Sequence, residues 1–159
     1  IMFTGKAHAE VTEFHRSNTD ENLKKITETV AELGLENIDV KKSDRGLTIS
    51  IENIQFQPDS SLLMDSEKIK LVKIGEILKE FENDLLVTGH CAKRGTLKMQ
   101  QQISEERASA VADYLAKLKI RNPNCIFTQG KGASDPVDTN QTEEGRARNR
   151  RVEITIMDK

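Results

Sequence analysis

Helical and strand periods alternate along the second half of this chain, and this alternation constrains the fold more than any other feature. Apolar side chains recur at helical spacing in residues 66–81 and again in residues 96–118, where Thr96 can act as the N-cap. Two short apolar runs, 85–89 and 126–128, follow these segments and predict buried strands. Helices that alternate with strands require crossover connections, so the sequence predicts a sheet that is at least partly parallel.

A further helix and a hairpin precede this unit. Apolar residues at a 3-4-3 spacing predict a helix over residues 17–34, with Gly34 as its stop signal. Residues 38–40 predict a short strand, and residues 47–51 alternate between apolar and polar side chains, as a second strand would. The segment Ser-Asp-Arg-Gly at 43–46 lies between them and is typical of a hairpin turn.

The C-terminal segment completes the predicted sheet. A Gly-rich and polar loop, 130–145, leads into an alternating strand at 152–156. Because no helix is expected between the strand at 126–128 and this last strand, the last strand can run antiparallel. We therefore predict an α+β fold with a mixed parallel and antiparallel sheet, a βαβαββ core packed by helices, and an extra helix and strand in front. Residues 1–16 show no clear period and are interpreted as a tail or linker, so one domain covers 17–159.

Composition excludes several classes of function. The chain has 159 residues, which fits one domain that needs no disulfide or metal to fold. Its formal net charge of −2 argues against a nucleic-acid-binding protein, which is usually basic. Only 36% of the residues are hydrophobic and no apolar run approaches the length that spans a bilayer, so no membrane insertion is expected of this segment. The first residues lack the regions of a signal peptide, and we interpret the chain as a fragment of a longer protein or a processed one.

The two cysteines and three histidines predict neither a metal site nor a catalytic centre. Their spacing matches no metal-ligand pattern. Cys91 has His90 beside it but no acid placed to orient that histidine, so a nucleophilic cysteine is not expected. Cys91 follows one predicted strand and Cys125 precedes the next, and parallel neighbours would place the two thiols at opposite ends of the sheet. We therefore predict no disulfide between them, no bound metal or cofactor, and no enzymatic activity.

Arg107 stands out because it lies within an apolar helical stripe. It follows Ile103 by four residues and precedes Val111 by four, so the three side chains share one helix face. An unpaired guanidinium is costly to bury. The sequence therefore predicts an acidic partner for Arg107, which is either a carboxylate of this protein or a carboxylate of a ligand.

Three segments together resemble the OmpA-like domain, the peptidoglycan-associating module of outer-membrane proteins, lipoproteins and flagellar stator proteins. They are Thr88–Thr96, Ile103–Ala108 and Gly145–Ile154, of which the last, Gly-Arg-x-Arg-Asn-Arg-Arg-Val-Glu-Ile, is the most specific. The resemblance covers about residues 37–159. It also includes Phe56 with Asp59-Ser60, the 130–137 loop and Asn140.

The resemblance implies non-covalent binding to the peptide stem of peptidoglycan. In that family an arginine of the second helix takes the carboxylate of the diamino acid, and Arg107 matches it. An aspartate of the preceding loop takes the amino group, and this position falls on Ala92. The family's asparagine early in the helix falls on Gln100. Because losing the partner of a buried ammonium costs several kcal/mol, the resemblance implies weakened or altered specificity unless another acid replaces the aspartate. The candidates are Asp59, Glu105, Glu106 and the acids of the 130–145 loop.

Four arginines near the C-terminus also need an interpretation. Arg146, Arg148, Arg150 and Arg151 would suggest a nucleic-acid patch in isolation, but they are expected to open an alternating strand, whose side chains point to opposite faces. We expect them to pair with acidic residues at the starts of helices, with Arg150 nearest the pocket. The predicted ligand-binding residues are therefore Arg107, Phe56, Asp59, His90, Ala92, Gln100 and Arg150.

Two hypotheses about function follow. The first is a non-catalytic module of a larger outer-membrane-associated or envelope protein, which binds a peptidoglycan stem peptide in the periplasm and anchors that protein to the cell wall. The second is a degenerate domain that serves as a structural or protein-interaction module without binding peptidoglycan. In the second case a carboxylate of the protein neutralises Arg107.

Overall fold

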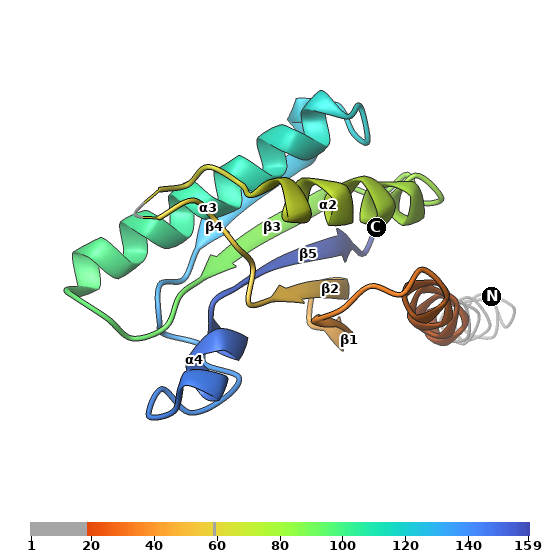
Figure 1. Ribbon diagram of the computed structural model, residues 1–159. Coiled ribbons are helices and arrows are strands. Elements are labelled where there is room, and N and C mark those ends of the chain that lie inside the picture. The colour runs from red at the N-terminus through yellow and green to blue at the C-terminus, as the bar shows by residue number, and fades with distance from the viewer. Residues whose placement is uncertain (1–18, 59) are drawn as a thin grey trace, which may run out of the picture.

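The computed structural model describes residues 19–58 and 60–159 (Figure 1). Residues 1–16, interpreted as a tail or linker, and Asp59 lie outside the described residues. The described part of an N-terminal helix covers 19–32. The elements that follow are β1 (Ile38–Ser43), β2 (Gly46–Glu52), α2 (Asp65–Leu78), β3 (Leu85–His90), α3 (Leu97–Lys117), the 3-10 helix η1 (Pro123–Cys125), β4 (Ile126–Gly130), α4 (Glu143–Asn149) and β5 (Arg151–Met157).

The five strands form one mixed sheet in the order β1-β2-β5-β3-β4. The hairpin of β1 and β2 turns between Ser43 and Gly46, as predicted. β3 and β4 are parallel, and β5 runs antiparallel to both β2 and β3. The predicted α+β fold with its antiparallel last strand is therefore confirmed. No helix within the described residues is long and apolar enough to cross a bilayer.

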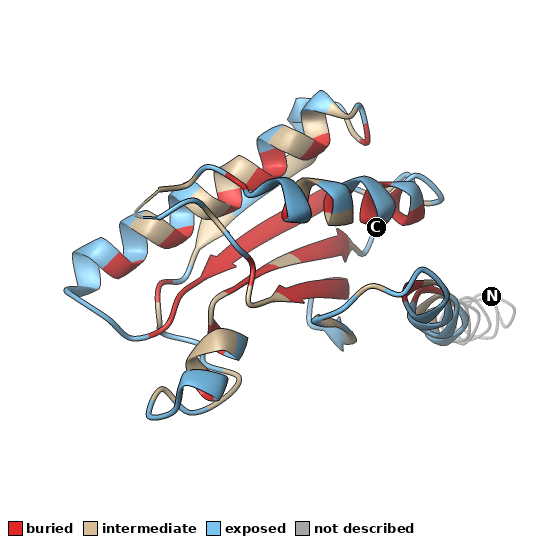
Figure 2. Cartoon of the chain, viewed as in Figure 1, coloured by how far each residue is buried: buried red, intermediate tan, exposed pale blue. Residues whose placement is uncertain are grey.

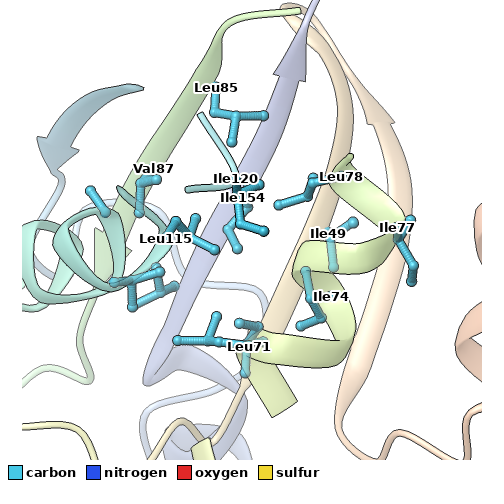
Figure 3. Close-up of a cluster of buried hydrophobic side chains, with 14 of the residues drawn as sticks. Ile49, Leu71, Ile74, Ile77, Leu78, Leu85, Val87, Leu115, Ile120 and Ile154 are labelled. Carbon is cyan, nitrogen blue, oxygen red and sulfur yellow. The ribbon is translucent and has the colours of Figure 1, made fainter. Parts of the chain in front are cut away.

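The core lies between the sheet and the two long helices, which cover one of its faces (Figures 1 and 2). Leu71 and Ile74 of α2 and Leu115 of α3 are fully buried against Ile49 and Ile154 of the sheet (Figure 3). The N-terminal helix adds two buried side chains, Ile26 and Val30, to the same cluster. The apolar residues that recur at helical spacing in the sequence are thus the residues that the helices bury in the core.

The opposite face of the sheet is largely polar, with Leu86 and Phe127 as apolar exceptions. Strand alternation places Thr48, Thr155 and Glu153 there, and the Oγ1 atoms of the two threonines are 2.8 Å apart. Glu153 contacts three cationic or ionisable groups: Lys41 Nζ at 2.9 Å, His90 Nε2 at 2.9 Å and Arg151 Nε at 3.3 Å. These contacts hold the pKa of Glu153 well below its usual range, although burial alone would raise it. This face is therefore held together by internal ion pairs.

Two glycines let α3 lie directly on the carboxyl ends of β3 and β4. A Cβ at Gly89 would lie 1.9 Å from the carbonyl oxygen of Ser104, and one at Gly130 would lie 2.5 Å from the backbone nitrogen of Glu105. Gly130, expected to begin the 130–145 loop, is instead the last residue of β4 and packs closely against the helix. Gly132 does serve a turn, because its φ is +56°.

The segment before β5 differs from the prediction. Residues 143–149 form α4, whereas a loop followed by a strand was expected. This helix has no apolar period to reveal it, and Thr142 caps it by accepting a hydrogen bond from the Gly145 amide. Arg146 and Arg148 therefore lie on a helix and Arg150 at its C-cap, so the strand alternation expected for them is wrong. Only Arg151 opens β5.

Both cysteines are free, as predicted. Leu85 is paired with Ile126 in the parallel register, so Cys91 lies beyond the end of β3 while Cys125 precedes the start of β4. The two thiols therefore lie at opposite ends of this pair of strands.

Candidate functional site

Arg107 lies at the edge of the buried face of α3. Ala108 and Val111 are fully buried, whereas Arg107 is only half-buried, so it flanks the apolar stripe and does not lie in its middle. Its Cζ atom is 4.7 Å from the centroid of the Phe56 ring, within the range of a cation–π contact. The aromatic ring thus holds the guanidinium at the border between core and solvent.

No carboxylate of the described residues lies within ion-pair distance of Arg107. Its Nε is buried without a hydrogen-bond partner in this part of the chain. Burial lowers the pKa of Arg107, Cys91 partly offsets this, and the charge of Arg150 lowers it further. An arginine nevertheless stays protonated at neutral pH. The site therefore presents a partly desolvated cation.

The acids proposed to neutralise Arg107 either do not pair with it or are not described. The Oε1 atoms of Glu105 and Glu106 accept hydrogen bonds from the side-chain amides of Gln101 and Gln102. Asp59 lies outside the described residues.

The 55–64 loop positions Phe56 against α3. Phe56 forms an isolated antiparallel bridge with Leu63, and the Gln57 amide donates to the carbonyl oxygen of Leu62 at 2.8 Å. A second bond runs from the Met64 amide to the carbonyl oxygen of Gln55 at 3.2 Å. The loop is thus a small hairpin that places the Phe56 ring on the guanidinium.

Arg150 brings a second positive charge to this region. Its carbonyl oxygen accepts a hydrogen bond from the Ile54 amide at 3.2 Å, which ties the end of α4 to the segment before Phe56. Its Nη2 is 2.5 Å from Oε1 of Glu143, a surface ion pair that lowers the pKa of Glu143. The charge of Arg150 lowers the pKa of Arg107, and its role as a ligand-binding residue stays a prediction.

Cys91 and Ala92 follow the end of β3, and Cys91 lies within electrostatic reach of Arg107. The Cys91 thiol donates to the carbonyl oxygen of Gln100 at 3.6 Å, and its amide donates to the carbonyl oxygen of Gly132 at 2.9 Å. Burial raises the pKa of this thiol, although Arg107 lowers it in part. A protonated, packed thiol is a poor nucleophile. Ala92 is buried and adds no charge.

Gln100 is buried inside the loop that it follows. Its side-chain nitrogen donates to the carbonyl oxygen of Gly95 at 3.1 Å, so the amide holds the 91–95 loop against the start of α3. Thr96 caps that helix by accepting a hydrogen bond from the Met99 amide. The structure therefore shows Gln100 supporting the loop.

His90 does not join the Arg107 site. It is the last residue of β3, not part of a loop, and its Nε2 donates to Glu153 at 2.9 Å. Because Gly89 faces α3, strand alternation turns His90 to the opposite, polar face of the sheet. The prediction of His90 as a ligand-binding residue assumed that the strand ends at residue 89, whereas β3 continues through His90 and turns its side chain away from Arg107.

Two asparagines have structural roles that reasoning from the sequence missed. The Asn149 Oδ1 accepts from the amides of Val137 and Asp138, and its Nδ2 donates to the Oδ1 of Asn140 at 2.9 Å. The same Asn140 oxygen accepts from the Lys93 amide at 3.3 Å. Together they join the 130–142 loop, α4 and the 91–95 loop. Both asparagines belong to the segments that resemble the OmpA-like domain, and this resemblance was the signal in the sequence that could have identified them.

A sequence profile of the OmpA family matches residues 55–150, and the chain belongs to this family. Outer membrane protein A of Bordetella avium is 37% identical over 103 residues, which are 64% of this chain and 53% of that protein. Peptidoglycan-binding protein ArfA of Mycobacterium tuberculosis is 33% identical over 104 residues, which are 65% of this chain and 32% of that protein. The chain thus spans about half or less of these relatives.

Solved structures agree with this assignment. The cell wall anchor of the T6SS from Pseudomonas aeruginosa superposes with a TM-score of 0.71 at 29% identity, covering 83% of this chain and 96% of that chain. An outer membrane protein from Borrelia burgdorferi superposes with a TM-score of 0.63 at 33% identity, covering 76% of this chain and 97% of that chain.

Proposed function

We propose that this domain binds the stem peptide of peptidoglycan without catalysis and anchors a larger envelope protein to the cell wall in the periplasm. The observation that carries the proposal is the Arg107 guanidinium, which is half-buried, stacked on Phe56 and without a carboxylate partner among the described residues. The names of a mycobacterial relative and of a Pseudomonas structure, which refer to peptidoglycan and to the cell wall, support it.

The chemistry of binding would be recognition of a carboxylate. A guanidinium offers two parallel N–H groups that match the two oxygens of a carboxylate, and Arg150 adds favourable charge nearby. Phe56 fixes the plane of the guanidinium, and Ala92 leaves room without charge. An ammonium on the same carbon as the bound carboxylate would find no acid at Ala92, so we propose weakened or altered specificity toward diamino acids.

Sedimentation with purified peptidoglycan sacculi tests this proposal. Sacculi with diaminopimelate and with lysine in the stem should both be used, with the parent, Arg107→Ala and Arg107→Lys. Losing charge-assisted hydrogen bonds worth about 1.5–3 kcal/mol should weaken binding by roughly ten-fold to a hundred-fold in Arg107→Ala. Arg107→Lys should recover only part of it, because lysine lacks the fork geometry. The matched control is Arg45→Ala, which removes an exposed arginine from the β1–β2 turn.

One observation favours the alternative function, a structural or protein-interaction module. Gln100, at a position that differs from the family pattern, is engaged in internal hydrogen bonds with Gly95 and with the Cys91 thiol. If the parent binds neither type of sacculus, or if Arg107→Ala binds as the parent does, this alternative is preferred.

A further inference from the structure

A groove adjoins the Arg107 site along the outward face of α3. It encloses about 830 Å³ between this helix and the segment that leads into α2. Leu63, which lines the groove, is the bridge partner of Phe56, whose ring contacts Arg107. Glu106, the residue before Arg107, lines it as well. The groove therefore lies next to the proposed carboxylate site, although neither Arg107 nor Phe56 lines it.

The lining of this groove is acidic. Four carboxylates face two lysines, an excess of two negative charges, and Lys68 lies over the Tyr114 ring at 5.9 Å from its centroid. The carboxylates are those of Asp65, Glu105, Glu106 and Asp113. Across the described residues, no cation lies within ion-pair distance of any of the four. The groove thus has uncompensated negative charge available to a cationic ligand.

The other side of the Arg107 site has the opposite charge. The 91–95 loop has no acid and contributes two exposed cations, Lys93 and Arg94, while Arg150 lies near Arg107. An ammonium group bound beside Ala92 would therefore meet repulsion. Charge complementarity instead favours an ammonium on the groove side.

We propose that the groove takes a primary ammonium group of the same peptide whose carboxylate binds Arg107. This inference rests on the proposed function. Glu106 is adjacent to Arg107 in the sequence. Asp113 comes six residues after Arg107 in α3, which corresponds to about 9 Å along the helix axis at a rise of about 1.5 Å per residue. The preferred ligand is thus a wall peptide in which several bonds separate the carboxylate from the ammonium. A group with both charges on one carbon fits less well.

Calorimetry with two synthetic stem peptides tests this inference. One has a free C-terminal carboxylate and a lysine side chain in the third position, and the other is the same peptide acetylated on that lysine. Acetylation should weaken binding to the parent by about five-fold, the upper end for an exposed ion pair. In the double variant Glu106→Gln and Asp113→Asn, both peptides should bind as weakly as the acetylated peptide binds the parent.

A matched control is the double variant Glu32→Gln and Glu36→Gln, which removes the same charge from two exposed sites outside the groove. It should retain the five-fold preference of the parent. Equal affinity of the parent for the two peptides, together with loss of binding in Arg107→Ala, would overturn the groove inference and leave the proposed function intact. Unchanged binding of both peptides by Arg107→Ala would overturn the proposed function and the inference with it.

Discussion

Arg107 and Arg151 illustrate two different uses of the same side chain on the two faces of one sheet. Arg151 has only 1% of its surface exposed, and its guanidinium bonds to Glu153 and to the carbonyl oxygen of Asp135. Arg107 lies on the helix-covered side, half-buried, with an aromatic ring as its neighbour and no carboxylate within the described residues. Oxygen atoms of the protein compensate Arg151, although its Nη1 atom has no hydrogen-bond partner among the described residues, whereas no carboxylate of these residues compensates Arg107. We propose that this difference distinguishes a structural cation from a cation that binds a ligand.

The largest effect is expected where a buried ion network is broken. Arg151→Leu removes a buried cation and leaves the partly buried Glu153 without one of its partners, so it should destabilise the fold by about 3–5 kcal/mol. Urea unfolding followed by circular dichroism measures this. A loss below about 1 kcal/mol would show that Arg151 is not structural and would remove the contrast with Arg107.

A smaller loss of stability is expected in acid. The pKa of Glu153 is depressed in the folded state, so its contribution is fully present above its unfolded value of about 4.5 and is lost as the pH falls toward the folded value. This contribution should be on the order of 2 kcal/mol. Unfolding free energies of the parent and Glu153→Gln, measured between pH 7 and pH 3, should converge as the pH falls. A constant difference would contradict the assignment.

The loop around the site should depend on Asn149. Asn149→Ala removes four hydrogen bonds that join the 137–140 segment to α4, at a cost of about 1–3 kcal/mol. Proteolysis should then cut first within 130–142. Asn124→Ala, which changes an exposed asparagine, is the control. Identical cleavage rates for the two variants would argue that the loop is held by other contacts.

The smallest effect on stability is expected at the binding cation. Arg107→Ala loses a cation–π contact but also removes a partly buried charge, so its unfolding free energy should stay within about 1 kcal/mol of the parent. The same urea experiment measures it beside Arg151→Leu. A loss as large as that of Arg151 would mean that Arg107 is neutralised inside the protein, and would favour the structural hypothesis.

Periodicity predicted most of this fold because each long element has one apolar face. The 85–89 strand and the 96–118 helix each contribute buried apolar side chains, such as Val87 and Leu115, to the core. The spacing of these apolar positions fits only one type of secondary structure in each segment. α4 escaped prediction because polar bonds hold its seven residues, including the cap of Thr142. His90 was misplaced because one extra residue of strand turns a side chain to the other face.

The site was predictable only in part. The helical spacing of Arg107 between Ile103 and Val111 identified this cation as unusual from the sequence alone. The contact with Phe56 depends on the 55–64 hairpin, whose single bridge between Phe56 and Leu63 has no period to detect. The hydrogen bond from the Gln100 side chain to the carbonyl oxygen of Gly95 likewise depends on the folded loop. Local patterns therefore revealed which residue was unusual, while the folded loops determine what surrounds it.

The place of β5 in the sheet has a consequence for how the domain assembles. This strand comes after every other strand in the chain, yet it lies between β2 and β3 and is hydrogen-bonded to both. Until it inserts, the hairpin and the parallel pair remain two halves with unsatisfied edges, which are prone to incorrect pairing. The step that joins the halves also brings Arg150 beside Phe56 and Arg107. Completion of the sheet and assembly of the groups around Arg107 are thus one event, and a nascent chain without the β5 segment would have neither.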